Sequence, residues 1–128
     1  MYNAGECIII ETDYYEDGSS RAHLFVVILD AHEDDDITLL VPMDSIPEKG
    51  WYDSTTLLEV GEHDFVIKPT YMNYNEGIYR NKIWIDRNGK RRPPPISSEL
   101  LKRISLGIRN SEHVPNDVYE FYLYRNLN

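Results

Sequence analysis

Two short stretches of the sequence carry side chains suited to acid–base and phosphate chemistry. Arg21 and His23 precede one apolar stretch. Asp44 and Ser45 follow the next one. If the two stretches pair as a hairpin, the start of one strand lies opposite the end of its partner, which brings these residues together. A histidine or carboxylate there could move a proton, and an arginine could stabilise negative charge on a phosphate. An ordinary Arg21–Asp44 salt bridge is the structural alternative.

A second candidate region spans residues 61–74, where aromatic, amide and cationic side chains are crowded. Tyrosines interleaved with a lysine can stack on nucleobases and hold phosphates, as in single-stranded RNA sites. His63 is a further candidate for proton transfer. The residues predicted to contact RNA or a protein partner are Lys68, Thr70, Tyr71, Asn73, Tyr74, Arg80 and Lys82. Tyrosines half-buried at the surface of a small domain are the alternative interpretation.

Other chemistries lack their characteristic patterns. The sequence has no Gly-x-Gly-x-x-Gly, P-loop or Gly-x-Ser-x-Gly motif, which disfavours dinucleotide binding, Walker-type ATP hydrolysis and serine hydrolase activity. The histidines lack zinc-ligand spacing, and Cys7 is the only cysteine of the sequence. The run Asp34–Asp36 lacks the spaced carboxylates and the glycine of a calcium loop. We therefore expect no metal and no cofactor.

The elements that must position these residues are mostly strands. Apolar residues at 23–30 and 37–43 predict two buried strands joined by a polar hairpin tip. Shorter strands are predicted at 6–12, 55–60 and 64–68, and alternation at 77–85 predicts another with a polar tip at 86–89. Helical spacing begins only after the prolines, at 97–108 and from 116 onward, behind capping serine and asparagine residues.

This order predicts one mainly β (α+β) domain over residues 1–128. We expect a small barrel or bent antiparallel sheet at about 6–90, a proline connector at 93–95 and a helical part at 97–125 with one or two helices. No apolar run is long enough to span a membrane, and the N-terminus lacks the basic residues of a signal peptide. A single cysteine also fits a reducing compartment, so we expect a cytoplasmic protein.

Charge is distributed unevenly along this acidic chain, whose net charge is −9. Residues 1–64 hold 16 acidic and 2 basic side chains, whereas residues 65–128 hold 6 acidic and 11 basic ones. An acidic front half repels a phosphate backbone, so nucleic acid would bind the back half. Attraction between the two halves inside one fold is the alternative explanation.

The order of these features resembles the MazF/PemK/Kid family of bacterial toxins. Ser20-Arg21-Ala22-His23-Leu24 stands where that family begins a strand after an Arg-Pro step, and Val41-Pro42-Met43-Asp44-Ser45 stands at its Val-Pro-Val-Thr-Ser type motif. Met72-Asn73-Tyr74 stands at a Cys-Asp-Gln-type strand, and residues 97–108 stand at the C-terminal helix. The resemblance covers about residues 20–108. Only Arg21 and Ser45 carry over residue by residue, because Ala22, Asp44 and Asn73 differ from the family's residues.

The resemblance implies an SH3-like barrel, metal-independent cleavage of single-stranded RNA, a homodimer and an antitoxin that covers the site. Two functions follow for this chain. One is a toxin-like endoribonuclease in which Arg21 stabilises charge and His23 or His63 transfers protons. The other is a non-catalytic protein-interaction module of the same fold, acting in a toxin–antitoxin or phage-defence unit. The departures from the motif and the acidic front half favour the module, whereas the crowded segment 61–74 favours the enzyme. A nucleic-acid mimic is a third alternative, based on the acid count alone.

Overall fold

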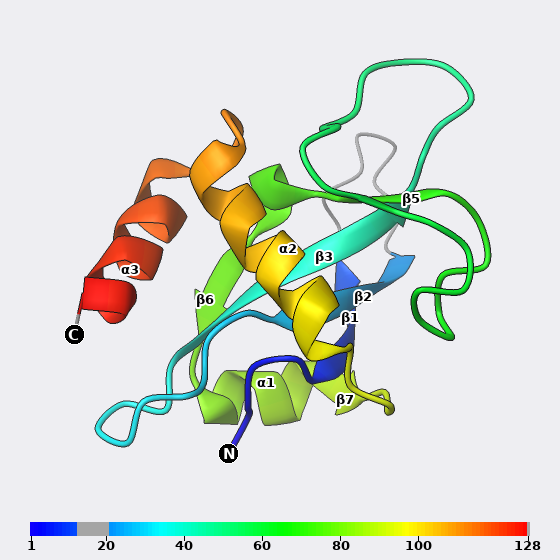
Figure 1. Ribbon diagram of the computed structural model, residues 1–128. Helices are drawn as coiled ribbons and strands as arrows, with labels where there is room; N and C mark the ends of the chain where they lie inside the picture. The colour runs from blue at the N-terminus through cyan, green and yellow to red at the C-terminus, as the bar shows by residue number, and fades with distance from the viewer. Residues whose placement is uncertain (13–20, 128) are drawn as a thin grey trace.

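The computed structural model describes residues 1–12 and 21–127, which form a bent antiparallel sheet with helices packed against it (Figure 1). The strands are β1 (Cys7–Thr12), β2 (Arg21–Val27), β3 (Thr38–Ser45), β4 (Leu57–Leu58), β5 (Thr70–Met72), β6 (Ile78–Arg80) and β7 (Gly89–Arg91). The helices are the 3-10 turn η1 (Tyr74–Glu76), α1 (Lys82–Asn88), α2 (Ser98–Asn110) and α3 (Asn116–Leu127). The predicted α+β class, a bent antiparallel sheet with C-terminal helices, is confirmed. Ser20, which contributes to the family resemblance, lies outside the described residues.

The centre of the sheet is the hairpin of β2 and β3. Leu24 pairs with Met43 and Val27 with Leu40, as expected for direct neighbours. The hydrogen-bonded order is β4-β5-β3-β2-β1-β7, and β6 pairs with β3 beside β5. β2 begins at Arg21, two residues earlier than predicted, because Arg21 still pairs with Thr12 of β1.

The apolar runs of β2 and β3 are continuous because the hairpin is buried on both faces. One face carries Leu24, Val26, Leu39, Val41 and Met43 into the core under α2 and α3. The other face carries Phe25, Val27 and Leu40 against Tyr2 and Ile85. The site-bearing ends of β2 and β3 therefore extend from the best-packed part of the molecule.

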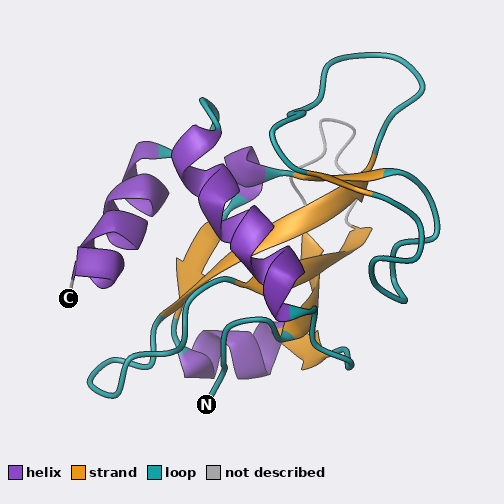
Figure 2. Ribbon diagram, in the orientation of Figure 1, coloured by secondary structure: helices purple, strands orange, loops and turns teal. Residues whose placement is uncertain are grey.

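Helix α2 lies across one face of the sheet (Figure 2). Ser97 caps it by accepting a hydrogen bond from the Leu100 N–H at 3.1 Å, as the sequence predicts. Its buried stripe of Leu100, Ile104 and Ile108 follows the helical period. Helix α2 thus closes the core directly over the segment that leads out of β5.

The prediction of a strand over 77–85 with a tip at 86–89 is wrong in its second half. Only Ile78–Arg80 forms a strand, and Lys82–Asn88 forms α1. Asn81 starts the helix because its side chain accepts the Trp84 N–H at 2.9 Å. Ile83 is 63% exposed while Ile85 is fully buried, so the apolar alternation does not mark one face of a strand.

Two shorter strand predictions are also wrong. The prediction over 55–60 is reduced to Leu57–Leu58, and residues 64–68 contain no strand. Gly61, with a φ of +98°, turns the chain, and the Val66 N–H is held by the His63 carbonyl at 2.9 Å. Local turns thus use the backbone groups that a strand would offer to a neighbour.

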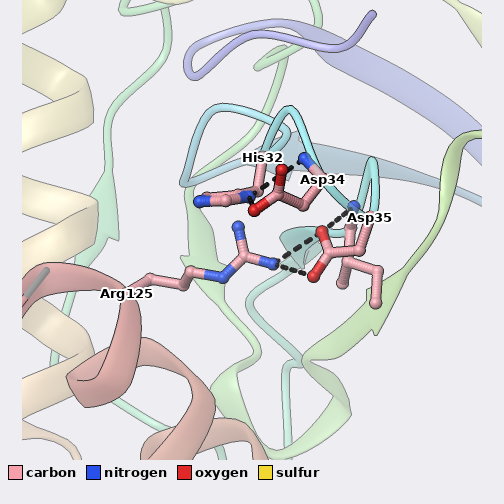
Figure 3. A network of polar contacts seen from close by, with 5 residues as sticks. His32, Asp34, Asp35 and Arg125 are labelled. Carbon is pink, nitrogen blue, oxygen red and sulfur yellow. Dashed lines mark hydrogen bonds and ion pairs between the residues drawn. The ribbon is translucent and has the colours of Figure 1, made fainter.

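Ion pairs connect the acidic front half of the chain to the basic back half. Arg125 of α3 donates to both carboxylate oxygens of Asp35, at 2.7 and 2.8 Å, and Figure 3 shows it reaching the loop between β2 and β3. Further pairs of this kind are Arg91–Glu6 and Arg103–Glu62. Attraction between the halves therefore contributes to this fold. None of the helices in the described part of the chain is long and apolar enough to cross a membrane.

Candidate functional site

A cleft of about 500 Å³ opens where β2 begins and β3 ends. Figure 1 shows β5 beside this end of β3. Its polar lining residues are Arg21, His23, Asp44, Ser45, Lys68, Thr70, Tyr71 and Asn73. The first four are the residues that the hairpin register predicts to meet, and the structure brings them together. The others arrive because β5 pairs antiparallel with the end of β3, with Tyr71 opposite Asp44 and Thr70 opposite Ser45.

His23 and Asp44 form a close pair at the floor of this cleft. The Nδ1 atom of His23 lies 2.6 Å from Oδ1 of Asp44, and the two side chains are 8% and 14% exposed. Because the carboxylate accepts the Nδ1 proton, the imidazole is held as the tautomer whose lone pair is on Nε2. Such an orienting carboxylate prepares a histidine to accept a proton.

Asn73 holds the second oxygen of the same carboxylate. Its Nδ2 donates to Oδ2 of Asp44 at 2.9 Å, while its own backbone N–H donates to the Pro42 carbonyl at 2.9 Å. The result is a hydrogen-bonded chain, Asn73–Asp44–His23, that crosses from β5 through β3 to β2. We call it the His23 chain. It fixes the imidazole through Nδ1, because the carboxylate that holds this nitrogen is itself held by Asn73.

Arg21 and Lys68 add positive charge to the cleft from two different segments. Arg21 begins β2, and Lys68 is in the loop before β5, where its carbonyl accepts the Thr70 hydroxyl at 2.8 Å. Both side chains belong to exposed residues that line the cleft. Two cations beside an oriented histidine form a setting in which a phosphodiester can be bound and its developing charge stabilised.

Several residues singled out from the sequence lie elsewhere. His63 is buried outside the cleft: its Nε2–H donates to the Pro94 carbonyl at 2.7 Å, and its Nδ1 accepts the Phe65 N–H at 3.1 Å. Both ring nitrogens therefore hold loops. Tyr74 is 1% exposed, and its hydroxyl donates to the Ile104 carbonyl at 2.7 Å, so it has no face for a base.

Arg80 and Lys82 are also outside the cleft, in β6 and at the start of α1. The Arg80 guanidinium lies 5.0 Å from the Trp84 ring centre. The Lys82 Nζ is 2.6 Å from Oδ2 of Asp86. Neither residue lines the cleft with Lys68, because the chain turns into α1 after β6 instead of continuing as a strand.

Glu76 is coupled to the site although sequence reasoning did not select it. Burial raises the pKa of its carboxyl above the usual range, and the negative charge of Asp44 adds to this rise, against the lowering effects of the Asn75 hydrogen bond and of His23. Glu76 is the last residue of η1, the turn that follows Asn73 directly, so its closeness in sequence to Asn73 is a signal that could have indicated it. Within residues 1–12 and 21–127, no three His, Cys, Asp or Glu side chains gather as metal ligands.

No protein-family model, curated protein sequence or solved structure matches the chain.

Proposed function

We propose that this protein is a toxin-like endoribonuclease that cleaves single-stranded RNA without a metal ion, in the cytoplasm, as part of a bacterial toxin–antitoxin type system. The observation that carries the proposal is the His23 chain at the floor of a cleft that also holds Arg21 and Lys68. The resemblance of the two strand-end motifs to the MazF/PemK/Kid family supports the same activity.

The proposed reaction is an internal transesterification of the RNA backbone. Nε2 of His23 takes the proton of a ribose 2′-hydroxyl, and the 2′-oxygen attacks the adjacent phosphorus. The bond from phosphorus to the 5′-oxygen breaks, and that oxygen takes a proton from water. The hydroxide left behind takes the proton from the His23 imidazolium, which restores the neutral histidine. The products are a 2′,3′-cyclic phosphate and a 5′-hydroxyl. Asp44 keeps the lone pair on Nε2 and stabilises the imidazolium that forms.

Arg21 and Lys68 stabilise the negative charge that gathers on the phosphoryl oxygens during attack. Fixed charges of this kind act strongly in a partly enclosed site because they need no reorganisation when the reaction occurs. Loss of one such group slows catalysis by roughly 10²–10³-fold. Ser45 lies at the exposed end of β3 and lines the same cleft. In this proposal its hydroxyl donates a hydrogen bond to a phosphoryl oxygen.

The partners follow from the same proposal. An antitoxin would cover the cleft, and the chain would pair with a second copy, as the family resemblance implies. The alternative function is a non-catalytic module of a toxin–antitoxin or phage-defence unit that binds a protein through this cleft. The exposed apolar side chains at its mouth, Phe65 and Ile67, are the observation that favours it.

The test is cleavage of a mixed-sequence single-stranded RNA in the presence of a chelator. We expect His23→Gln to lower the rate by roughly 10²–10⁴-fold and Arg21→Ala by roughly 10²–10³-fold. Lys102→Ala, which removes an exposed cation of α2 outside the cleft, is the matched control and keeps the wild-type rate. Activity that disappears with the chelator would contradict the proposed chemistry and direct attention to Asp34–Asp36. Absence of cleavage in both conditions would favour the protein-binding module.

A further inference from the structure

The cleft has an apolar side that the proposed chemistry does not use. Phe65 is 37% exposed and Ile67 is 76% exposed, yet both line the same cleft as Arg21 and Lys68. We call these two residues the apolar wall. Exposed single apolar residues are common on proteins, but a pair on one side of a polar cleft is a feature that a ligand can use.

The fold forces the apolar wall outward. Val66, between its two members, is 2% exposed and belongs to the core under α2. The Phe65 N–H is bound by Nδ1 of His63 at 3.1 Å, and the Val66 N–H by the carbonyl of His63 at 2.9 Å. His63 is itself tied to Pro94. Val66 is anchored inward and two successive backbone N–H groups are held by His63, and the side chains on either side of Val66 line the cleft.

We infer that the apolar wall is a nucleobase subsite that holds one base of the substrate beside the phosphate bound by Arg21 and Lys68. The inference rests on the proposed function and extends it by naming where a base binds. A nucleotide fits both sides of the cleft, since it joins a flat apolar ring system to an anionic phosphate. The cleft volume of about 500 Å³ lies in the usual range of small-ligand pockets, roughly 300–1,000 Å³.

The same cleft joins this subsite to the reacting groups. Tyr71 lines the cleft, lies opposite Asp44 in the β3–β5 pairing, and packs against Tyr52 with ring centres 5.4 Å apart. The apolar wall, on the loop that leads into β5, and the His23 chain therefore border one continuous cleft. A base held on Phe65 would fix the adjacent ribose and its 2′-hydroxyl near His23, which is how remote binding improves orientation at the reacting centre.

The experiment compares two substrates, of which only one carries nucleobases. One is a short single-stranded RNA. The other is 2-hydroxypropyl 4-nitrophenyl phosphate, which keeps an internal hydroxyl and a phosphodiester but has no base. We expect Phe65→Ala to lower kcat/KM on the RNA by roughly 5- to 100-fold, the range for loss of one base–aromatic stack. Its rate on the base-free substrate stays within about twofold of wild type.

Matched controls separate this result from a general loss of structure. Ile67→Ala shares the effect of Phe65→Ala to a smaller degree because an aliphatic side chain offers no ring to stack. Ile83→Ala removes an isoleucine that is 63% exposed on α1, outside the cleft, and leaves both rates unchanged. Equal losses on both substrates would overturn the subsite, since they would show that the apolar wall only supports the reacting groups. Unchanged RNA cleavage in Phe65→Ala would overturn it as well.

Binding of an uncleavable 2′-O-methyl oligonucleotide distinguishes failure of the subsite from failure of the proposed function. Fluorescence anisotropy measures its Kd for wild type, Phe65→Ala and Ile83→Ala. If the wild type cleaves neither substrate but Phe65→Ala alone weakens oligonucleotide binding, the endoribonuclease proposal fails and the subsite stands. If wild type and Phe65→Ala bind equally, or neither binds at low salt, the subsite fails and the apolar wall is explained by a protein partner.

Discussion

Replacement of Gly107 by alanine tests how α2 is seated on the sheet. Glycine inside a helix usually destabilises it, and alanine at such a position stabilises the helix by about 1 kcal/mol relative to glycine. At this buried position a Cβ atom would lie 2.5 Å from Cζ of Tyr74, and closer still to its hydroxyl and to Oγ1 of Thr56. The ring of Tyr74 is fully buried and cannot move aside without disturbing the core.

The expected loss of stability follows from these contacts. Overpacking costs about 1–3 kcal/mol. Displacing the Tyr74 hydroxyl breaks its bonds to the Ile104 carbonyl at 2.7 Å and to Thr56 at 2.8 Å, and one buried polar group left unpaired costs about 1–3 kcal/mol. After the gain in helix propensity, we expect Gly107→Ala to lower the free energy of unfolding by about 3 kcal/mol.

Urea unfolding followed by circular dichroism measures this change. With a slope of about 2 kcal/mol per molar urea for a chain of this size, the midpoint falls by about 1.5 M. Leu106→Ala is the control on the same helix, since its side chain is 58% exposed, and it changes stability by no more than about 0.5 kcal/mol. A Gly107→Ala protein as stable as wild type would refute the reasoning. It would mean that α2 lies farther from Tyr74 and the sheet than the structure shows.

Three further predictions concern ionisation. Burial raises the pKa of the Cys7 thiol to about 11, so at pH 8 we expect it to react with a disulfide reagent only after unfolding in urea; rapid labelling of the native protein would contradict this. Desolvation raises the pKa of Asp35, but the Ile37 N–H and the Arg125 guanidinium outweigh it and the pKa is lowered. This stabilisation is present above the unfolded pKa of about 3.9 and is lost as pH falls through the lower folded value. Asp35→Asn should therefore reduce the free energy of unfolding by no more than about 1 kcal/mol at pH 7, with a smaller effect at pH 2, and a larger effect at the lower pH would contradict the assignment. Burial, followed by the hydrogen bond to Asp86, raises the pKa of Tyr2 to about 12. The stability that this confers is present below about pH 10 and is lost as pH rises through 12. Tyr2→Phe should therefore make the free energy of unfolding less dependent on pH across that interval.

The central hairpin of β2 and β3 could be predicted from the sequence, because strands buried on both faces leave an unbroken run of apolar residues. The runs in β2 and β3 are apolar at every position because both faces of the hairpin are covered, and their shared polar tip predicts direct pairing. Helix α1 could not be predicted from periodicity. The alternating Ile83 and Ile85 fit a strand equally well, and the helix depends on capping by Asn81 and on the cluster around Tyr2, far away in sequence.

The site was predictable to the same extent. Arg21, His23 and Asp44 meet because they end two strands whose pairing is visible in the sequence. The link to Asn73 depends on the register of β5, a strand of only three residues, and no local pattern fixes that register. His63 has the right chemistry for catalysis, but the tertiary structure uses both of its ring nitrogens to hold loops.

The separation of charge between the two halves bears on how this protein can be made. The acidic half emerges from the ribosome first, with β1, β2 and β3, while the partners that complete it come much later. β1 needs β7 at its second edge, the core under α2 needs residues near 104, and Asp35 needs Arg125, which is 90 residues away. Contacts so distant in sequence form late, because the intervening chain must first be closed. The nascent chain therefore passes through a stage in which its negative charges lack their counterparts and the cleft is not yet assembled. Under the proposed function, RNA cleavage would therefore begin only after the basic half has been synthesised and has paired with the acidic half.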